Sequence, residues 1–272
     1  MTASNAEQIE YWNGKVGERW AAFQETLDAA MADITAAALA FADARPGERA
    51  LDVGCGCGTT ALRLAAATGA PVTGVDISAP MLAVARKRAP ALTFIEADAS
   101  VHGFDPSFDL VFSRFGVMFF ADPAGAFANI RTALKPGGRL RFVCWRTAPE
   151  NAWAAATFAA VKDLLPPQPP ADPTAPGPFA FGDGERLKGI LGRAGFRNAR
   201  LEKLDTAMNM GASLDAAIDQ AFKIGPTARA LAEVDDATKA VARRRIGEAL
   251  ARFLGPRGVT PPAACWLAAG ET

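Results

Sequence analysis

The segment Leu51–Thr60, LDVGCGCGTT, constrains the fold of this 272-residue chain more than any other segment. It follows an apolar run and places glycine at positions 54, 56 and 58. Alternating glycines weaken a regular strand or helix, but they let the backbone turn sharply and approach a ligand. The segment therefore predicts a turn from a buried strand into a helix, at the edge where open α/β sheets bind ligands.

Short apolar runs alternate with helical patterns on either side of this turn. The expected strands are 50–54, 72–77, 92–97, 108–115 and 140–145, and the expected helices between them are 60–67, 80–88 and 122–134. Ser78 is expected to cap the second of these helices. Such β-α-β alternation is typical of a parallel sheet that helices cover on both faces.

The flanking segments are expected to be mainly helical. An apolar stripe that starts at Val16 predicts one helix reaching Ala42. After residue 148 we expect helices at 151–165, 214–223 and 227–253, another capped by Asp183, and strands at 196–205 and 263–268. Prolines concentrate in 166–178, which predicts a stiff surface connection.

Composition and charge exclude several classes of protein. Hydrophobic residues make up 50% of the chain and charged residues 21%, which is typical of a globular domain. Lys plus Arg and Asp plus Glu both total 29, so nothing favours nucleic acid or a membrane surface as partner. No apolar run reaches the roughly 20 residues of a membrane span, and the polar start lacks the pattern of a secretory signal. We therefore expect a cytoplasmic protein.

Two acidic residues follow the next two expected strands. Asp76 ends the second strand, where a carboxylate can accept hydrogen bonds from ribose hydroxyls, although a plain helix-capping role is the alternative. Asp98 ends the third strand and can accept from an adenine amino group, although it can equally be a solvated loop carboxylate. Because both follow strands next to the glycine loop, together they indicate an adenosine-containing ligand.

These features, in this order, resemble the class I S-adenosylmethionine-dependent methyltransferases. The nearest group is the ubiquinone/menaquinone-biosynthesis-like methyltransferases that act on small molecules. The resemblance rests on Asp52–Gly58 (D-x-G-x-G-x-G), Gly74–Ser78, Ala97–Ala99, Phe108–Val111 and Leu134–Gly138. It covers roughly residues 48–145 and the late strands.

The resemblance implies an α/β fold: a Rossmann-like, seven-stranded, mostly parallel three-layer sheet. It further implies an N-terminal helical lid (1–45), a cofactor-binding core (46–148) and a C-terminal part of the same domain (149–272). That part holds the Pro-rich loop 166–178 and a helical cap insertion (213–255) before the last strand. A lid helix folded over the cofactor would bring Trp12 and Trp20 to the pocket.

The resemblance also implies which residues contact S-adenosyl-L-methionine and a small-molecule substrate. The expected cofactor contacts are Trp20, Asp52, Gly54, Cys55, Gly56, Thr59, Thr60, Asp76, Ile77, Met81, Asp98, Ala99 and Ser113. The expected substrate pocket is Tyr11, Trp12, Arg114, Phe115 and Met118. Arg114 could hold an anionic substrate or make a structural ion pair. No catalytic residue is assigned, because a sulfonium already activates its methyl group.

Two other functions stay open, and several residues are given no role in chemistry. An NAD-type oxidoreductase fingerprint would require glycine at position 59, which is Thr59. A non-catalytic cofactor-binding regulator would lack turnover. Cys55 and Cys57 fill the variable positions between the glycines, and no metal site follows from their spacing. The run 243–245 of three arginines is interpreted as a solvated helix face, and a homodimer is possible.

Overall fold

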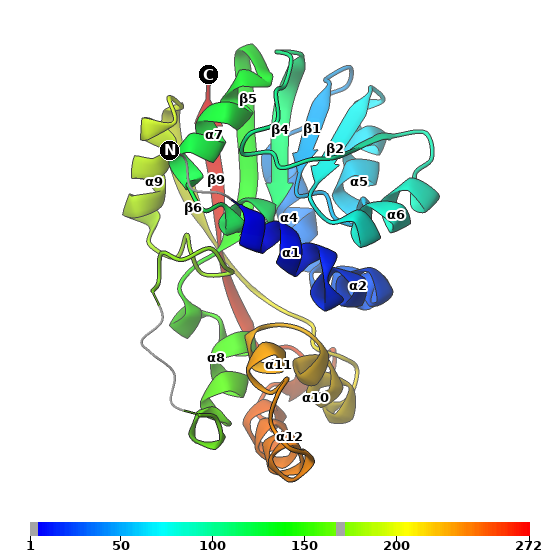
Figure 1. Ribbon diagram of the computed structural model, residues 1–272, viewed down its shortest axis with the longest axis vertical. Coiled ribbons are helices and arrows are strands. Elements are labelled where there is room, and N and C mark those ends of the chain that lie inside the picture. Colours follow the sequence, from blue (N-terminus) through cyan, green and yellow to red (C-terminus); the bar gives the residue numbers. More distant parts are fainter. Residues whose placement is uncertain (1–4, 167–171) are drawn as a thin grey trace.

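The computed structural model describes residues 5–166 and 172–272. Its centre is a seven-stranded sheet with the order β3-β2-β1-β4-β5-β9-β6 (Figure 1). The strands are β1 (Ala50–Val53), β2 (Val72–Asp76), β3 (Thr93–Glu96), β4 (Phe108–Arg114), β5 (Leu134–Trp145), β6 (Arg197–Ala207) and β9 (Pro262–Glu271). The strands β1 to β5 pair in parallel, and β9 pairs antiparallel with β5 and β6. The predicted α/β, mostly parallel sheet is confirmed.

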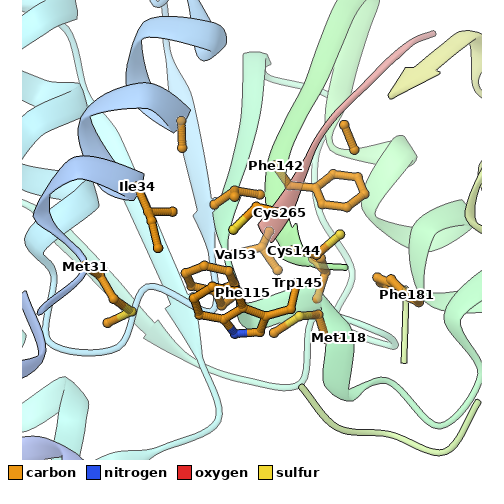
Figure 2. Close-up of a cluster of buried hydrophobic side chains, with 14 of the residues drawn as sticks. Met31, Ile34, Val53, Phe115, Met118, Phe142, Cys144, Trp145, Phe181 and Cys265 are labelled. Carbon is orange, nitrogen blue, oxygen red and sulfur yellow. The ribbon is translucent and has the colours of Figure 1, made fainter. Parts of the chain in front are cut away.

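Helices pack on both faces of this sheet. The helices α4 (Ala32–Ala42), α5 (Thr59–Thr68) and α6 (Ala79–Arg88) contact its strands, as do α7 (Pro123–Thr132) and α9 (Gly184–Arg193), which also contact each other. All four residues of β1 are buried, as expected for a parallel strand covered on both sides. Figure 2 shows part of the core, where Val53, Phe142 and Cys265 of three strands lie between Ile34 and Phe181.

The N-terminal segment differs from the prediction. The single helix expected from Val16 to Ala42 is wrong: this region consists of α2 (Lys15–Ala22), α3 (Gln24–Ala30) and α4, preceded by α1 (Ala6–Asn13). Phe23 and Met31, at the breaks, have ψ angles of 19° and 15°, which are not helical. A straight helix of that length would be roughly 40 Å long and would project past the sheet. The breaks instead fold α1 and α2 across its lower edge (Figure 1).

A group of four helices, called the cap here, lies beyond the ends of β5, β6 and β9 (Figure 1). It consists of α8 (Ala152–Ala159), α10 (Leu214–Lys223), α11 (Pro226–Ala230) and α12 (Asp236–Ala251), followed by the short strands β7 (Leu254–Gly255) and β8 (Gly258–Val259). The helix expected over 227–253 is interrupted, because the Asp235 carboxylate accepts from the Thr238 N–H and starts α12. The helix expected over 151–165 ends at Ala159.

Two local predictions were wrong, and a third concerns residues that the structure describes only in part. The Ser78 hydroxyl does not cap α6 but donates to the carbonyl of Trp12 at 2.7 Å. The strand expected to begin at residue 140 begins at Leu134. Of the Pro-rich loop 166–178, residues 167–171 lie outside the described residues. No helix in the described part of the chain is long and apolar enough to cross a membrane.

A glycine pair brings the end of β1 against the segment that follows β4. A β-carbon on Gly54 would lie 2.6 Å from Cα of Gly116, and one on Gly116 would lie 2.7 Å from Cα of Gly54. Gly54 also has φ +69°, a conformation that residues with side chains rarely adopt. The two backbones therefore touch at a point where no side chain fits.

We expect Gly54→Ala to lower the free energy of unfolding by about 3 kcal/mol or more, because it adds overpacking to backbone strain. Gly69→Ala is the matched control: Gly69 has φ +61° but nothing within 4 Å of an added β-carbon. It should lose only about 1–2 kcal/mol, the cost of the left-handed conformation alone. Urea unfolding of both variants measures the difference, and equal losses would contradict the close-contact argument.

Candidate active site

The glycine loop, residues 54–58, is held by the end of β2. The N–H groups of Gly54 and Cys55 donate to the carbonyl of Val75 at 2.8 and 3.2 Å. The N–H of Gly56 donates to Oδ2 of Asp76 at 2.7 Å. The φ angles of Gly54, Gly56 and Gly58 are all positive, which explains why the sequence needs glycine at these positions. Helix α5 begins directly after the loop, so its N-terminus points toward the same edge of the sheet.

Two carboxylates follow the glycine loop along the sheet edge. Asp76 accepts from Gly56 and also, through Oδ1, from the Ser78 N–H at 2.9 Å. Burial raises the pKa of Asp76, although its backbone hydrogen bonds oppose the shift. Asp98 accepts from the Asn5 side chain at 3.0 Å and from the Ser100 N–H at 2.9 Å. A carboxylate has about four acceptor positions, so both groups can still accept from a ligand.

One large pocket lies over these strand ends, between the sheet, α1 to α3 and the cap. Including its open mouth, it holds about 1430 Å³ of empty space. The charged side chains of the described lining are Asp28, Asp76, Asp98 and Arg114, and aromatic and aliphatic side chains make up much of the rest.

The structure brings most of the predicted site residues to this pocket. Of the expected cofactor contacts, Trp20, Gly54, Cys55, Gly56, Thr59, Thr60, Asp76, Ile77, Met81, Asp98 and Ala99 line it. Of the expected substrate residues, Trp12, Arg114, Phe115 and Met118 line it. These residues come from the N-terminal helices, the glycine loop and the ends of β2 to β4, so the pocket assembles from segments far apart in the sequence.

Asp52, Ser113 and Tyr11 are not among the residues that line the pocket. Asp52 is fully buried beneath the loop, where it accepts from the Thr60 hydroxyl at 2.6 Å. Ser113 is fully buried next to Gly116: its hydroxyl oxygen would lie 3.2 Å from a β-carbon added to Gly116. Tyr11 lies under the Arg229 guanidinium, 5.4 Å from its ring centre, because neighbouring residues on a helix point in different directions.

The sequence prediction missed the pocket residues that come from the cap and the end of β5, and several that come from the N-terminal segment. The lining residues not predicted from sequence include Asn5, Gln24, Leu27, Asp28, Met31, Trp145, Trp153, Pro178, Met208, Ile224 and Pro226. Trp145 ends β5, so the strand-end rule that selected Asp76 would also have found Trp145. The residues from the cap carry no such signal, because no repeating motif places them.

Asp28 of α3 connects the N-terminal helices to the glycine loop and to β4. Its carboxylate accepts from the Thr59 hydroxyl at 2.5 Å, from Arg114 at 3.0 Å and from the Gln24 amide. Arg114 also donates to the Thr35 hydroxyl at 2.8 Å. The Asp28 and Arg114 side chains are only 19% and 15% exposed, so their ion pair is largely shielded from water. Of the two roles proposed for Arg114, the structure therefore supports an ion pair.

An aromatic wall faces the loop from the ends of β4 and β5. The Phe115 ring stacks on Trp145, with centroids 4.2 Å apart and planes 13° from parallel (Figure 2). Trp153 of α8 continues the wall, 4.9 Å from Trp145. Phe115 has φ +64°, which is an outlier for a bulky side chain and marks backbone strain at the pocket. Trp12 lies against Trp20 and Phe119 in edge-to-face contacts.

The cysteines and the arginine run do not form further sites. All four cysteines are free and buried, and burial raises the pKa of Cys57 to about 11, so its thiol stays protonated at neutral pH. The three consecutive arginines pair with three separate carboxylates, Asp219, Glu248 and Asp163, as expected for a solvated helix face. Within 5–166 and 172–272, no three metal-binding side chains gather.

Comparison with known proteins agrees with this geometry. A family described as "Methyltransferase domain" matches residues 51–142. An uncharacterized protein of Mycobacterium bovis is 30% identical over 239 residues, covering 82% of each chain. The demethylmenaquinone methyltransferases of Chlorobaculum tepidum and Thermus thermophilus are 42% and 38% identical over 103 and 125 residues. The chain belongs to the class I S-adenosylmethionine-dependent methyltransferases.

The two demethylmenaquinone methyltransferases match over only part of their length. The aligned regions cover 38% and 44% of this chain and 42% and 57% of the relatives, so the chain spans about half of each. Solved structures support the fold. A phosphoethanolamine N-methyltransferase 2 of Haemonchus contortus, in complex with S-adenosyl-L-methionine, has a TM-score of 0.59 at 19% identity over 99% of this chain and 60% of that one. The YcgJ protein of Bacillus subtilis has a TM-score of 0.59 at 18% identity, over 89% and 98%.

The environment of Asp52 predicts that the free energy of unfolding depends on pH. Burial raises its pKa to about 7, although the Thr60 hydroxyl lowers it in part. The folded protein therefore holds a proton that the unfolded chain releases above about pH 4. The stabilisation from this group is complete below about pH 4 and is lost as the pH rises to about 7.

We expect wild-type protein to lose on the order of 2–3 kcal/mol of unfolding free energy between pH 5 and pH 8 from this group. Asp52→Asn should lack that component, because asparagine does not titrate. Urea unfolding at both pH values compares the two slopes. The same pH-dependent loss in variant and wild type would contradict the buried neutral carboxyl.

The contacts of Asp28 predict that this residue stabilises the N-terminal helices. Asp28→Asn removes the charge that faces Arg114, and amide exchange in residues 15–30 should become about tenfold faster. Asp33→Asn is the matched control, because its ion pair with Arg257 is exposed on both sides. Hydrogen exchange followed by mass spectrometry makes the comparison; unchanged protection in Asp28→Asn would show that other contacts hold the helices.

Proposed function

We propose that this protein binds S-adenosylmethionine over the ends of β1 to β4 and transfers its methyl group to a small-molecule acceptor. One observation carries the proposal: the glycine loop, Asp76 and Asp98 follow three neighbouring strands and line one pocket. The alternating glycines expose backbone, and the two carboxylates lie at successive distances from it along the edge. This arrangement suits a ligand with an amino-acid part, a ribose diol and an adenine.

The donor set fits that cofactor. Gly54 and Gly56 line the pocket without side chains, so polar groups of the amino-acid part can approach the backbone. Asp76 would accept from the ribose hydroxyls, and Asp98 would accept from the adenine amino group. Met81 and Ile77 supply apolar surface beside them. In this proposal Trp20 covers the cofactor from α2, while Trp12 and Phe119 help to close the mouth.

When bound, S-adenosylmethionine supplies a methyl group activated by a sulfonium cation. The residues of this chain contribute position and exclusion of water. The Phe115–Trp145 stack and Met118 form a rigid wall on which an acceptor can be oriented. In this proposal the acceptor attacks with its own lone pair or carbanion, and none of the lining carboxylates Asp28, Asp76 and Asp98 is assigned as a base.

Two alternatives were open from the sequence. An oxidoreductase of the NAD type would need glycine at position 59, where the Thr59 hydroxyl hydrogen bonds to Asp28. A non-catalytic regulator would bind the cofactor without consuming it, so formation of S-adenosylhomocysteine in the presence of an acceptor separates it from an enzyme. The division at 1–45, 46–148 and 149–272, the cytoplasmic location and the possible homodimer remain predictions within this proposal.

We expect Asp76→Ala to weaken S-adenosylmethionine binding by about 10- to 100-fold, because hydrogen bonds to a buried charge are strong. Isothermal titration calorimetry measures the dissociation constant. Asp109→Asn is the matched control: its carboxylate pairs with Lys135 near the opposite end of β4. Because Asp76 also supports the glycine loop, thermal unfolding verifies that both variants fold. Unchanged affinity in Asp76→Ala would remove Asp76 from the proposed ribose site.

A further inference from the structure

The part of the pocket nearest the cap differs in chemistry from the part over the strand ends. Its side chains are Phe115, Trp145, Trp153, Met208, Ile224 and Pro226, all of them apolar or aromatic. They come from the ends of β4 and β5, from α8, from the residues that follow β6 and α10, and from the first residue of α11. The proposed cofactor residues lie on the other side, so this region is the remaining space for an acceptor.

A second, smaller pocket continues this apolar region into the cap. It shares Trp153, Met208, Ile224 and Pro226 with the large pocket. Its other lining residues are Ala154, Thr157, Met210, Gln220, Ala221 and Thr227. Its empty space is about 320 Å³, including its opening. None of the described residues that line this smaller pocket carries a charge. It and the apolar region beside it therefore form one neutral slot, apart from the charged part of the large pocket.

One polar group in the inner part of this slot has no partner. Gln220 of α10 is 7% exposed, and its Nε2 donates no hydrogen bond to any described residue. The other polar side chains there are satisfied: the Thr157 and Thr227 hydroxyls lie 2.8 Å apart, and Thr157 also reaches the carbonyl of Ala154 at 3.0 Å. A buried amide donor without a partner is costly, and leucine or methionine would fill the same space without that cost.

We propose that this slot, defined by the shared residues and Gln220, binds a neutral acceptor with an aromatic or apolar body whose far end carries a carbonyl-type hydrogen-bond acceptor. The Gln220 amide donates to that far group, while the body lies against Trp145 and Trp153. The inference rests on the proposed function, because it assigns the other end of the acceptor to the methyl-transfer side. Gln220 is a specificity-determining residue in this arrangement.

The slot argues against a charged far end. A phosphate, carboxylate or ammonium group would lose its hydration there without gaining an opposite charge. A purely apolar far end would give the Gln220 donor no hydrogen-bond partner. A neutral carbonyl satisfies both constraints, since it loses little hydration and accepts a hydrogen bond from the Gln220 amide.

Two related probes test the slot without knowledge of the natural acceptor. The first, 2-naphthol, has a hydroxyl and an aromatic body; the second, 6-hydroxy-2-acetonaphthone, adds a carbonyl at the far end. Binding is followed by quenching of tryptophan fluorescence in wild type, Gln220→Met and Asp215→Asn, with S-adenosylhomocysteine present. Asp215 lies on α10 but is exposed, so its variant is the matched control.

We expect wild type and Asp215→Asn to bind the acetonaphthone about tenfold more tightly than 2-naphthol, the effect of one neutral hydrogen bond in a buried site. Gln220→Met should lose this preference and bind 2-naphthol as well as wild type does. Equal affinity for both probes in wild type, or a preference that survives in Gln220→Met, would overturn the role of Gln220.

The same titrations distinguish failure of the slot from failure of the proposed function. If S-adenosylmethionine binds by calorimetry but neither naphthol derivative binds, the aromatic acceptor is wrong and the cofactor site stands. If the naphthol preference holds while S-adenosylmethionine does not bind, the proposed function fails and the slot stands. If Gln220→Met does not fold, the wild-type comparison of the two probes still decides whether a far carbonyl is recognised.

Discussion

The parallel pairing of β1 with both β2 and β4 is the constraint on which the rest of the structure depends. Chain connections leave β1 in one direction along the sheet and β4 in the other, so a crevice forms where the order reverses. The glycine loop and Gly116 meet at that point with no side chain between them. Asp76 then has two roles on the β2 side of the crevice: it holds the loop through Gly56, and it lines the pocket.

The sheet and the polar half of the pocket could be predicted because strand ends in a parallel sheet share one edge. Asp76 and Asp98 needed only that rule, and Trp145 would have followed from it. The rule does not say which way a side chain points. Ser113 lies near the end of β4 but is buried next to Gly116, and the Tyr11 ring packs under Arg229. Neither side chain lines the pocket.

The remaining features depend on contacts between segments far apart in the chain. An apolar stripe predicts that residues 16–42 are helical, but it cannot indicate that Phe23 and Met31 break the helix so that α3 brings Asp28 to Arg114. Gln220 shows the same limit. In sequence it is a polar residue on an amphipathic helix, and only the packing of α8, α10 and α11 makes it a buried donor.

The cap lies outside the stretch that matches the methyltransferase family, which ends at residue 142. Trp145, Trp153, Met208 and Gln220 all come after that point. The cap contributes no part of the glycine loop, so mutation there can change the acceptor side of the pocket while the loop itself keeps its own contacts with β2. Such a chain can diversify through changes in the cap alone, so relatives with the same glycine loop need not share an acceptor.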